Sequence, residues 1–456
     1  MKQQDSTNIT RREFLKKLGV GTGSAMALMA LEPFSALAAN YPLSPQTPTN
    51  HVGGDLQSTS QMTYRVQHGS GNPISLLGFG MMRLPDNQEE VNRLVDYAIE
   101  HGVNYFDTAP MYMRGRSEEL TGIALERHPR DKFFVATKMS NQNQRLWDFD
   151  AAVNMYHKSF ERLKVDYIDY YLLHSIGGGG VDNLKDRFLN NGLLPFLLKE
   201  REAGRIRQLG FSYHGDVSAF DWLLDHHDEY HWDFVQIQMN FLDWRHASLR
   251  GGRRVDADAE YLYNKCAKLG IQCVVMEPLR GGSFGRMAQE LTDQLRAVHP
   301  DDSTARWAFR WVGSFPNILT VLSGMNLMEH LQENVTTFSP LQPCTDDENK
   351  LLADIADQMA GFPTIPCTTC GYCMPCPYGV DIPANFAYYN GTVNEHILPN
   401  NITAFVEGYS KALPDSATWA RACQDCEECL SKCPQQIRIP NQMSRIVQTL
   451  KGRIQS

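Results

Sequence analysis

The sequence lacks an excess of positive charge: its 456 residues contain 43 Lys and Arg against 52 Asp and Glu, for a net charge of −9. Nucleic-acid-binding chains usually present a basic face, so no nucleic-acid partner is expected. Hydrophobic residues make up 42% of the chain, which is ordinary for a globular protein. At this length the chain exceeds one ordinary domain and can bury a large core.

Two nucleotide-binding signals are also missing. No Gly-x-Gly-x-x-Gly motif follows an early strand, and no flavin-binding motif is present. The first absence argues against an open-sheet nucleotide-binding fold. A glycine run at residues 177–180 follows an apolar strand, but it precedes Val-Asp-Asn instead of the Lys and Ser or Thr of a phosphate loop. We interpret it as a flexible active-site loop.

The N-terminal region contains no apolar run of membrane-spanning length. The segment Leu18–Leu31 is short for a membrane span and contains several glycines. Residues 10–16 before it read Thr-Arg-Arg-Glu-Phe-Leu-Lys, and residues 36–38 after it are small or apolar, Ala-Leu-Ala. This order is typical of a twin-arginine export signal with a peptidase site, and a chance Arg-Arg pair before a membrane anchor or core helix is the alternative.

We therefore predict a signal peptide at residues 1–38, export by the twin-arginine route to the periplasm, and no transmembrane segment in the mature chain. Residues 39–60 are rich in Pro, Ser, Thr, Gln and Asn, and are predicted to form a flexible linker.

Residues 61–341 alternate between apolar strands and amphipathic helices. The expected strands are Leu76–Phe79, Tyr105–Asp107, Phe133–Lys138, Tyr167–His174, Gln208–Ser212, Phe234–Met239, Gln272–Met276 and Leu319–Leu322. Expected helices between them include Glu89–His101, Ala151–Leu163, Ala219–Asp225 and Ala259–Leu269. The alternation predicts an α/β fold, a closed (β/α)8 TIM barrel, and a doubly wound open sheet is the alternative.

Three consecutive strands of this pattern end in chemically useful side chains. Asp107, Lys138 and His174 end the second, third and fourth strands, and Tyr112 follows in a Pro-containing loop five residues after Asp107. The C-terminal ends of parallel barrel strands meet at one rim, so these side chains are expected to converge. Polar strand ends that merely cap a barrel are the alternative.

With these residues in this order, the chain resembles the aldo/keto reductase family. The resemblance implies a TIM barrel, reversible reduction of a small carbonyl compound to an alcohol, and Asp107, Tyr112, Lys138 and His174 as a catalytic tetrad. A free tyrosine has a pKa of about 10, too high for an efficient acid near neutrality. A nearby Lys138 ammonium, held by Asp107, is expected to lower that pKa, and His174 to orient the substrate oxygen.

The same resemblance implies a nicotinamide cofactor, NAD or NADP. The matching positions are Gly80, Met81, Ser212, Gln236, Met276, Leu279, Ser323, Gly324 and Asn334. Many NADP-preferring members use basic side chains on the 2′-phosphate, where this chain has Gly324 and His330. The preference between NAD and NADP therefore stays open. Another basic residue, Arg280 or Arg286, could contact the 2′-phosphate from a neighbouring loop.

Eight of the 11 cysteines form two runs near the C-terminus. The first run comprises Cys367, Cys370, Cys373 and Cys376, and the second Cys423, Cys426, Cys429 and Cys433, each followed by proline. The second run has the spacing of bacterial ferredoxins, and the first is one residue shorter in its last gap. Soft thiolates suit iron–sulfur clusters. Zinc sites and disulfides are the alternatives. The remaining Cys266, Cys273 and Cys344 are predicted to be structural thiols.

The region from residue 364 to 445 resembles a two-cluster ferredoxin domain. The resemblance implies two [4Fe-4S] clusters with crossed ligation, in which Cys367, Cys370 and Cys373 share one cluster with Cys433. Cys423, Cys426 and Cys429 would share the other with Cys376. We predict a connecting helix within residues 342–363 and a mostly helical iron–sulfur domain at residues 364–456.

Two functions of different class fit these patterns. The first is an exported oxidoreductase that interconverts a carbonyl and an alcohol, joined to an electron-carrying domain and a redox partner protein. The second is an electron-transfer or interaction protein whose barrel is catalytically silent. Nicotinamide moves a hydride whereas each cluster moves single electrons, so the clusters either serve a partner or are structural.

Overall fold

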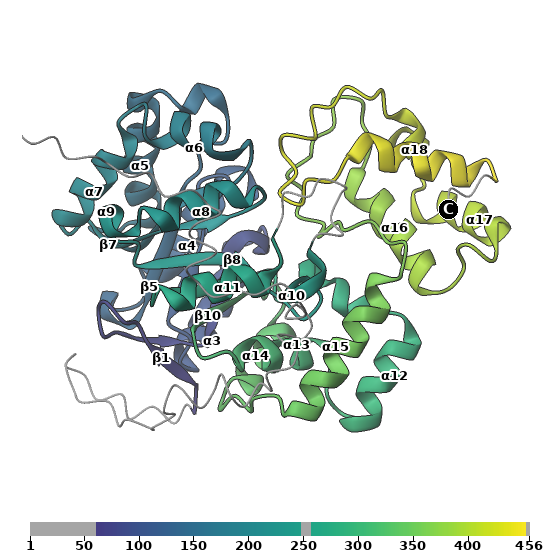
Figure 1. Ribbon diagram of the computed structural model, residues 1–456, viewed down its shortest axis with the longest axis horizontal. Coiled ribbons are helices and arrows are strands. Elements are labelled where there is room, and N and C mark those ends of the chain that lie inside the picture. The colour runs from purple at the N-terminus through teal and green to yellow at the C-terminus, as the bar shows by residue number, and fades with distance from the viewer. Residues whose placement is uncertain (1–60, 248–256, 453–456) are drawn as a thin grey trace, which may run out of the picture. The chain divides into compact units, whose positions relative to one another are not determined.

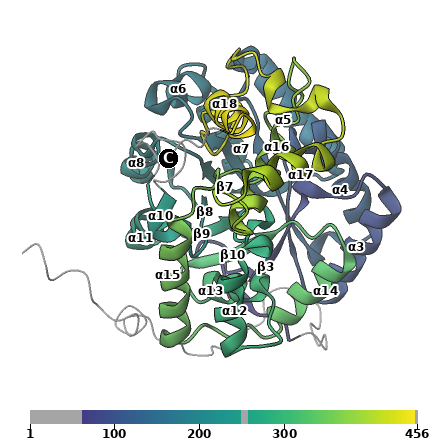
Figure 2. The same cartoon turned by 90° about the vertical axis from the view of Figure 1, so that its right-hand side faces the viewer.

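The computed structural model describes residues 61–247 and 257–452. The predicted signal peptide and linker lie outside these residues. Eight parallel strands close into a barrel in the order β3-β4-β5-β6-β7-β8-β9-β10, with β10 paired to both β9 and β3. Figure 2 shows β7, β8, β9, β10 and β3 following one another around the barrel. The predicted TIM barrel is confirmed and the open sheet was the wrong alternative.

The barrel strands lie within about two residues of their predicted bounds. They are β3 (Leu77–Gly80), β4 (Tyr105–Asp107), β5 (Phe134–Met139), β6 (Ile168–Ile176), β7 (Ile206–Tyr213), β8 (Phe234–Gln238), β9 (Gln272–Met276) and β10 (Ile318–Ser323). The helices of the barrel are α3 (Gln88–Glu100), α4 (Ser117–Leu125), α5 (Phe149–Leu163), α6 (Gly180–Phe188), α7 (Leu193–Glu202), α8 (Val217–Asp225), α9 (His227–Tyr230), α10 (Asp243–His246), α11 (Ala259–Lys268), α12 (Gln289–Val298), α13 (Thr304–Gly313) and α14 (Met328–Thr337).

Alternation along each strand produces two apolar layers. In β4, Tyr105 joins a cluster inside the barrel, whereas Phe106 packs in the layer between strands and helices. Inside the barrel the Tyr105 and Tyr170 rings lie 4.9 Å apart, centroid to centroid, and Tyr170 lies 5.1 Å from Phe234. Because aromatic rings fill the interior, the barrel is a packed core, and its chemistry is confined to the rim.

A short N-terminal hairpin precedes the barrel and was not predicted. Strand β1 (Tyr64–Val66) pairs with β2 (Pro73–Ser75) in antiparallel fashion, and Ile74 of β2 is fully buried in the interior cluster. Each strand of the hairpin has only 3 residues, too few to show a clear alternation of apolar and polar side chains in the sequence.

The C-terminal region has an apolar core of its own, extending from Ile365 to Ile446. Helix α15 (Asp346–Ala360) leads into it, followed by α16 (Ile382–Asn394), α17 (Ile402–Ala412) and α18 (Ile439–Leu450), shown from green to yellow in Figure 1. Helices α16 and α18 both begin with Ile-Pro, where proline is compatible with the first helical turn. The region is mostly helical, as predicted.

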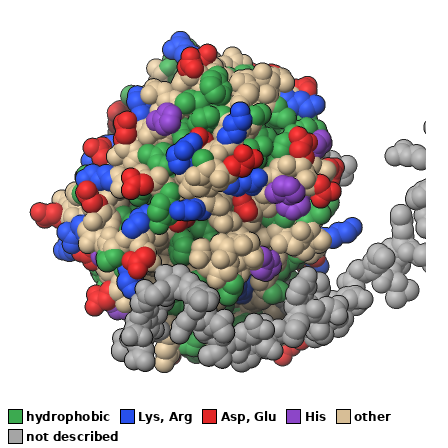
Figure 3. Space-filling model, turned by 90° about the vertical axis from the view of Figure 1, so that its left-hand side faces the viewer, with side chains coloured by type: hydrophobic (Ala, Val, Ile, Leu, Met, Phe, Trp, Pro, Cys, Tyr) green, Lys and Arg blue, Asp and Glu red, His purple; other side chains and the backbone are tan. Residues whose placement is uncertain are grey.

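The described surface carries charged side chains of both signs, as the composition of the chain suggests. On the face shown in Figure 3, basic and acidic side chains are interspersed, without a broad field of one sign. Within residues 61–247 and 257–452, no helix is both long and apolar enough to span a membrane.

Candidate functional site

The barrel rim brings the four predicted tetrad residues together. Asp107 ends β4, Lys138 lies near the end of β5, and His174 lies in β6. In the parallel register Asp107 is opposite Ala136, and Lys138 is opposite Leu172, so the three side chains emerge at neighbouring strand ends. Tyr112 begins the short helix that follows β4 and is buried.

Asp107 and Lys138 form a buried ion pair. Lys138 Nζ lies 2.5 Å from Asp107 Oδ1 and donates a second hydrogen bond, of 2.8 Å, to the carbonyl oxygen of Thr108. Gln236 Nε2 donates to the other carboxylate oxygen over 3.3 Å. Burial raises the pKa of Asp107 and lowers that of Lys138, while the attraction between the two charges opposes both shifts. The network fixes the ammonium in place.

The Lys138 ammonium lies over the phenol ring of Tyr112, 4.9 Å from the ring centroid. Burial raises the pKa of Tyr112 well above its usual value of 10, and neighbouring Tyr372 raises it further. The expected lowering of this pKa was therefore wrong for the molecule as described. The ammonium is already bonded to Asp107 and Thr108, and burial outweighs its effect on the phenol.

His174 packs edge-on against Tyr112, with ring centroids 5.9 Å apart at 79°. Its Nδ1 atom is 2.7 Å from Ser140 Oγ, and Arg187 donates to its carbonyl oxygen over 2.6 Å. Burial, with Lys138 nearby, lowers the pKa of His174 well below 6.5, so the ring is neutral at physiological pH. Ser140 was missed in the sequence, although its position two residues after Lys138 is a signal that the same rim contains it.

The buried ion pair leads to a stability prediction. Lys138→Met is expected to destabilise the barrel by about 3–5 kcal/mol, because it leaves the Asp107 carboxylate buried without its counter-charge. Burial raises the pKa of Asp107 in the folded state. As the pH falls, the folded carboxyl is therefore protonated at a higher pH than the unfolded one. The variant's stability is therefore favoured at low pH and falls as pH rises through the folded-state pKa. Chemical unfolding at about pH 5 and about pH 8 measures this difference.

The control for Lys138→Met removes both charges. The double variant Lys138→Met with Asp107→Leu is expected to recover most of the lost stability, because it leaves no unpaired buried charge. A double variant as unstable as the single one at both pH values would contradict the ion-pair assignment.

The residues predicted to bind a nucleotide lie on or just after strands β3, β7, β8, β9 and β10, except Asn334, which lies in helix α14. Four of them have partners within the protein: Gln236 bonds to Asp107, and Ser323 Oγ accepts a 3.0 Å hydrogen bond from Asn334 Nδ2. Ser212 Oγ accepts from the backbone of Ser175 at 2.9 Å. The others are Gly80, Met81, Met276, Leu279 and Gly324, at the strand ends or in the following loops.

A segment of the C-terminal region, Thr368–Tyr372, lies across these loops. Arg83, after β3, donates to the carbonyl oxygens of Thr368 (2.8 Å) and Thr369 (3.1 Å). The phenol of Tyr372 lies beside that of Tyr112 and contributes to raising the pKa of Tyr112. The segment therefore contacts the loops after β3 and β9, two of the loops predicted to hold the nicotinamide nucleotide.

One of the two basic residues suggested for the 2′-phosphate, Arg280, has another partner, and Arg83 covers Gly324. Arg280 lies 3.5 Å from Asp243 in an ion pair, and the side-chain stem of Arg83 packs on Gly324, 3.6 Å from an ideal Cβ there. Neither the position of Tyr372 beside Tyr112 nor the contacts of Arg83 were predicted from the sequence. Their partners are hundreds of residues away, and no local pattern signals such contacts.

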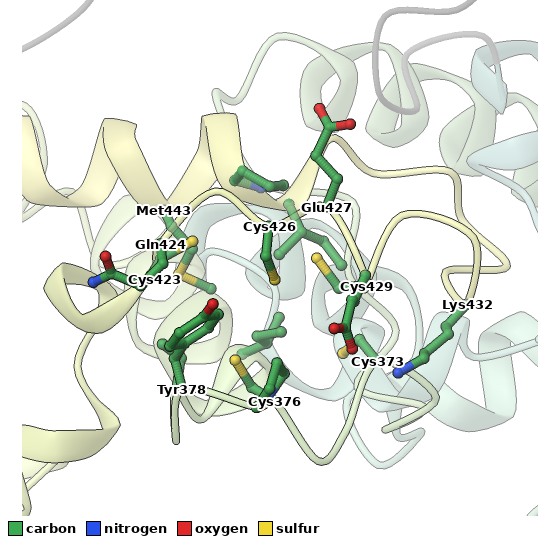
Figure 4. A pocket seen from close by; sticks show the side chains of 16 residues that line it. Cys373, Cys376, Tyr378, Cys423, Gln424, Cys426, Glu427, Cys429, Lys432 and Met443 are labelled. Carbon is green, nitrogen blue, oxygen red and sulfur yellow. The ribbon is translucent and has the colours of Figure 1, made fainter.

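The eight clustered cysteines are arranged as two crossed sets. The neighbouring thiols of Cys367, Cys370 and Cys433 raise the pKa of Cys373, and those of Cys423, Cys426 and Cys376 raise the pKa of Cys429, so each group of four lies together. In Figure 4 the sulfur atoms of Cys376, Cys423, Cys426 and Cys429 surround a common space. The fourth cysteine of each run thus lies with the first three of the other run, as the ferredoxin resemblance implied.

These cysteine sets fit iron–sulfur clusters in their chemistry. All eight are free thiols, so the disulfide alternative is not what the structure contains. Burial raises the pKa of Cys433 to about 12 and that of Cys429 to about 11, and thiols of this kind ionise when a cation binds them. In the described ranges, no three Cys, His, Asp or Glu side chains approach closely enough to hold a single metal ion.

Comparisons with known proteins agree with this division. The model of the aldo/keto reductase family matches residues 76–357, and that of the 4Fe-4S dicluster domain matches residues 366–438. The uncharacterized oxidoreductase YqkF of Bacillus subtilis is 27% identical over 296 residues, covering 61% of this chain and 92% of that protein. Glyoxal reductase of Bacillus subtilis is 27% identical over 244 residues, covering 53% and 76%.

Among solved structures, the aldo-keto reductase AKR11C1 of Bacillus halodurans, in its holo form, aligns with a TM-score of 0.52. The two chains are 23% identical, and the alignment covers 64% of this chain and 96% of the other. This similarity shows that the barrel fold is shared.

Proposed function

We propose, from the premise that this chain belongs to the aldo/keto reductase family, that it interconverts a small carbonyl compound and its alcohol at the barrel rim, with Tyr112 as proton donor and acceptor. Membership of this family makes the chain an oxidoreductase. A separate 4Fe-4S domain follows the barrel. The observation that carries the proposal is the assembly of Tyr112, His174 and the Asp107–Lys138 pair at one rim.

The residues have separable roles in this proposal. Burial keeps Tyr112 protonated at neutral pH, so its hydroxyl can donate to a carbonyl oxygen. The nearby Lys138 ammonium, held by Asp107, stabilises the phenolate that forms when the proton leaves. The neutral His174, held by Ser140, orients the same oxygen.

We also propose that the cysteine sets hold two [4Fe-4S] clusters, which supply one-electron transfer when bound. The set with Cys376 lies toward the surface: Cys426 is exposed, and nearby Tyr378 is 49% exposed. A redox partner protein would approach this set, since electron transfer between proteins needs a short path to the surface.

The test of the proposed activity is detection of the product alcohol. The anaerobically purified holoprotein, supplied with small carbonyl compounds and a chemical one-electron reductant, is expected to form the alcohol, and Tyr112→Phe is expected not to. Equal product formation by both proteins would contradict the proposal.

We propose, finally, that the protein is exported by the twin-arginine route, because Arg11 and Arg12 stand within the expected motif. Replacing both by lysine is expected to leave the precursor inside the cell, and fractionation followed by immunoblotting measures this. Lys16→Arg with Lys17→Arg is the matched control, since it alters basic residues outside the twin pair. Export of the twin-lysine variant at the normal level would exclude this route.

A further inference from the structure

We propose that the segment Thr368–Tyr372 fills the groove that a nicotinamide would need, so that the holoprotein works without an exchangeable NAD or NADP. Tyr372 then forms one wall of the substrate pocket beside Tyr112. The functional part of this proposal rests on the proposed carbonyl–alcohol activity. Whether the segment fills the groove is a separate property that can be measured without turnover.

The segment is held to the barrel by a side chain from the loop after β3. Arg83 follows β3 and donates hydrogen bonds to two successive carbonyl oxygens, those of Thr368 and Thr369, at 2.8 and 3.1 Å. The stem of the same arginine covers Gly324 after β10. A guanidinium is rigid and has several donors, so this contact holds the segment in one orientation.

The other side of the segment rests on the loop after β9. An ideal Cβ placed on Gly281 would lie only 2.0 Å from the carbonyl oxygen of Thr368, so the two backbones touch where any side chain would collide. Thr368 is buried, with 2% of its surface exposed. At this point of contact no other group fits between the two backbones, and a pocket beside it is lined by Arg280, Arg286 and Thr369.

The tip of the segment reaches the proposed catalytic tyrosine. The Tyr372 hydroxyl lies 3.9 Å from Met82 Sδ, and the Tyr372 phenol is a close neighbour of the Tyr112 phenol. Tyr372 stands between Cys370 and Cys373 of one cysteine set, so this set is the one beside the rim. A second contact holds the same set there: Gln435 donates to Gln238 of β8 at 3.1 Å, two residues after Cys433.

With the groove filled, no nicotinamide supplies a hydride, so the electrons for carbonyl reduction come from another donor. Reduction of a carbonyl breaks the C–O π bond and takes up two electrons and two protons. Two equivalents of a reduced one-electron carrier are oxidised to supply the electrons, which arrive by way of the cysteine-bearing segment. Tyr112 gives the proton that bonds to oxygen and is reprotonated by water, and water supplies the proton that bonds to carbon. One-electron steps favour conjugated carbonyl substrates, whose singly reduced form is delocalised.

The first experiment measures nucleotide in the holoprotein as isolated. Denaturation of the anaerobically purified full chain is expected to release no NAD or NADP. Calorimetric titration with NADH and with NADPH is expected to show no saturable binding up to about 1 mM, the upper end of common enzyme affinities. Release of one equivalent, or one-site binding below that concentration, would overturn the proposal.

The second experiment uses two neighbouring glycines as variant and control. Gly281 and Gly282 both have positive φ, 65° and 83°, but nothing lies within 4 Å of an ideal Cβ at Gly282. Alanine at either position strains the backbone, and only Gly281→Ala also collides with Thr368. Hydrogen exchange at residues 368–372 is expected to rise about tenfold or more in Gly281→Ala relative to Gly282→Ala.

Equal exchange in the two glycine variants would show that the segment does not rest on Gly281, and would overturn the proposal. Failure of the carbonyl–alcohol activity is recognised separately, because neither experiment contains a substrate. A holoprotein free of nucleotide and showing the Gly281-specific change, yet without turnover, would leave the filled groove standing and remove only the proposed reaction.

Discussion

Replacing Tyr112 by phenylalanine is expected to lower carbonyl turnover by about 10²–10⁴-fold, the usual contribution of a positioned general acid. The change removes the transferable proton and little volume, so the buried ring should keep its place against His174 and Lys138. Because burial holds the pKa of Tyr112 well above 10, wild-type turnover should not decline between about pH 7 and about pH 9 through ionisation of this phenol. Initial rates of alcohol formation measure both effects.

The matched control is Tyr105→Phe, two residues before Asp107 on the same strand. Tyr105 is fully buried inside the barrel, and its hydroxyl has no hydrogen-bond partner among the described residues. Its replacement therefore removes a hydroxyl of the same kind that is hydrogen-bonded to no rim residue, and turnover should stay within a small factor of wild type. Tyr112→Phe turnover as high as that of Tyr105→Phe would remove Tyr112 from the reaction.

The strands were predictable because each buries both of its faces. Strands such as Ile318–Ser323 appear in the sequence as short, mostly apolar runs, and the polar residue at the end of such a run marks the rim. Asp107, Lys138 and His174 could be placed together for that reason: parallel strands in a closed barrel leave one place for their C-terminal ends. The hairpin β1–β2 could not, because its contacts with the barrel are few and its strands short.

The side-chain contacts across the rim could not be predicted from the sequence. Gln236 was predicted to hold a nucleotide, yet it bonds to Asp107, because the closed barrel brings β8 opposite β4. The pairing of Tyr372 with Tyr112 joins residues 260 positions apart, and it depends on how the C-terminal region folds back over the barrel. The lowered pKa expected for Tyr112 was wrong for a related reason: the depth of its burial is a property of the packed molecule.

Replacing Cys376 by serine is expected to remove the cluster of the second cysteine run and to leave that of the first. The structure places Cys376 with Cys423 and Cys429, whereas Cys367, Cys370 and Cys373 lie with Cys433. Iron and acid-labile sulfide should fall from about eight to about four of each per chain, because a serine oxygen is a poor replacement for the fourth thiolate of a cubane. Iron analysis of the anaerobically purified protein measures this change.

The order of loss separates crossed from uncrossed ligation. Cys433→Ser should remove the other cluster, the one beside Tyr372, so the two variants should leave complementary paramagnetic signals after reduction. Cys344→Ser is the control, because that thiol lies in neither set and should leave about eight iron atoms per chain. If each run closed on itself, Cys376→Ser would instead abolish the signal of the cluster next to the barrel. The signal that survives in Cys376→Ser thus reports which cysteine set lies beside the rim, and its response to Tyr372→Phe would show whether that set is in contact with the pocket.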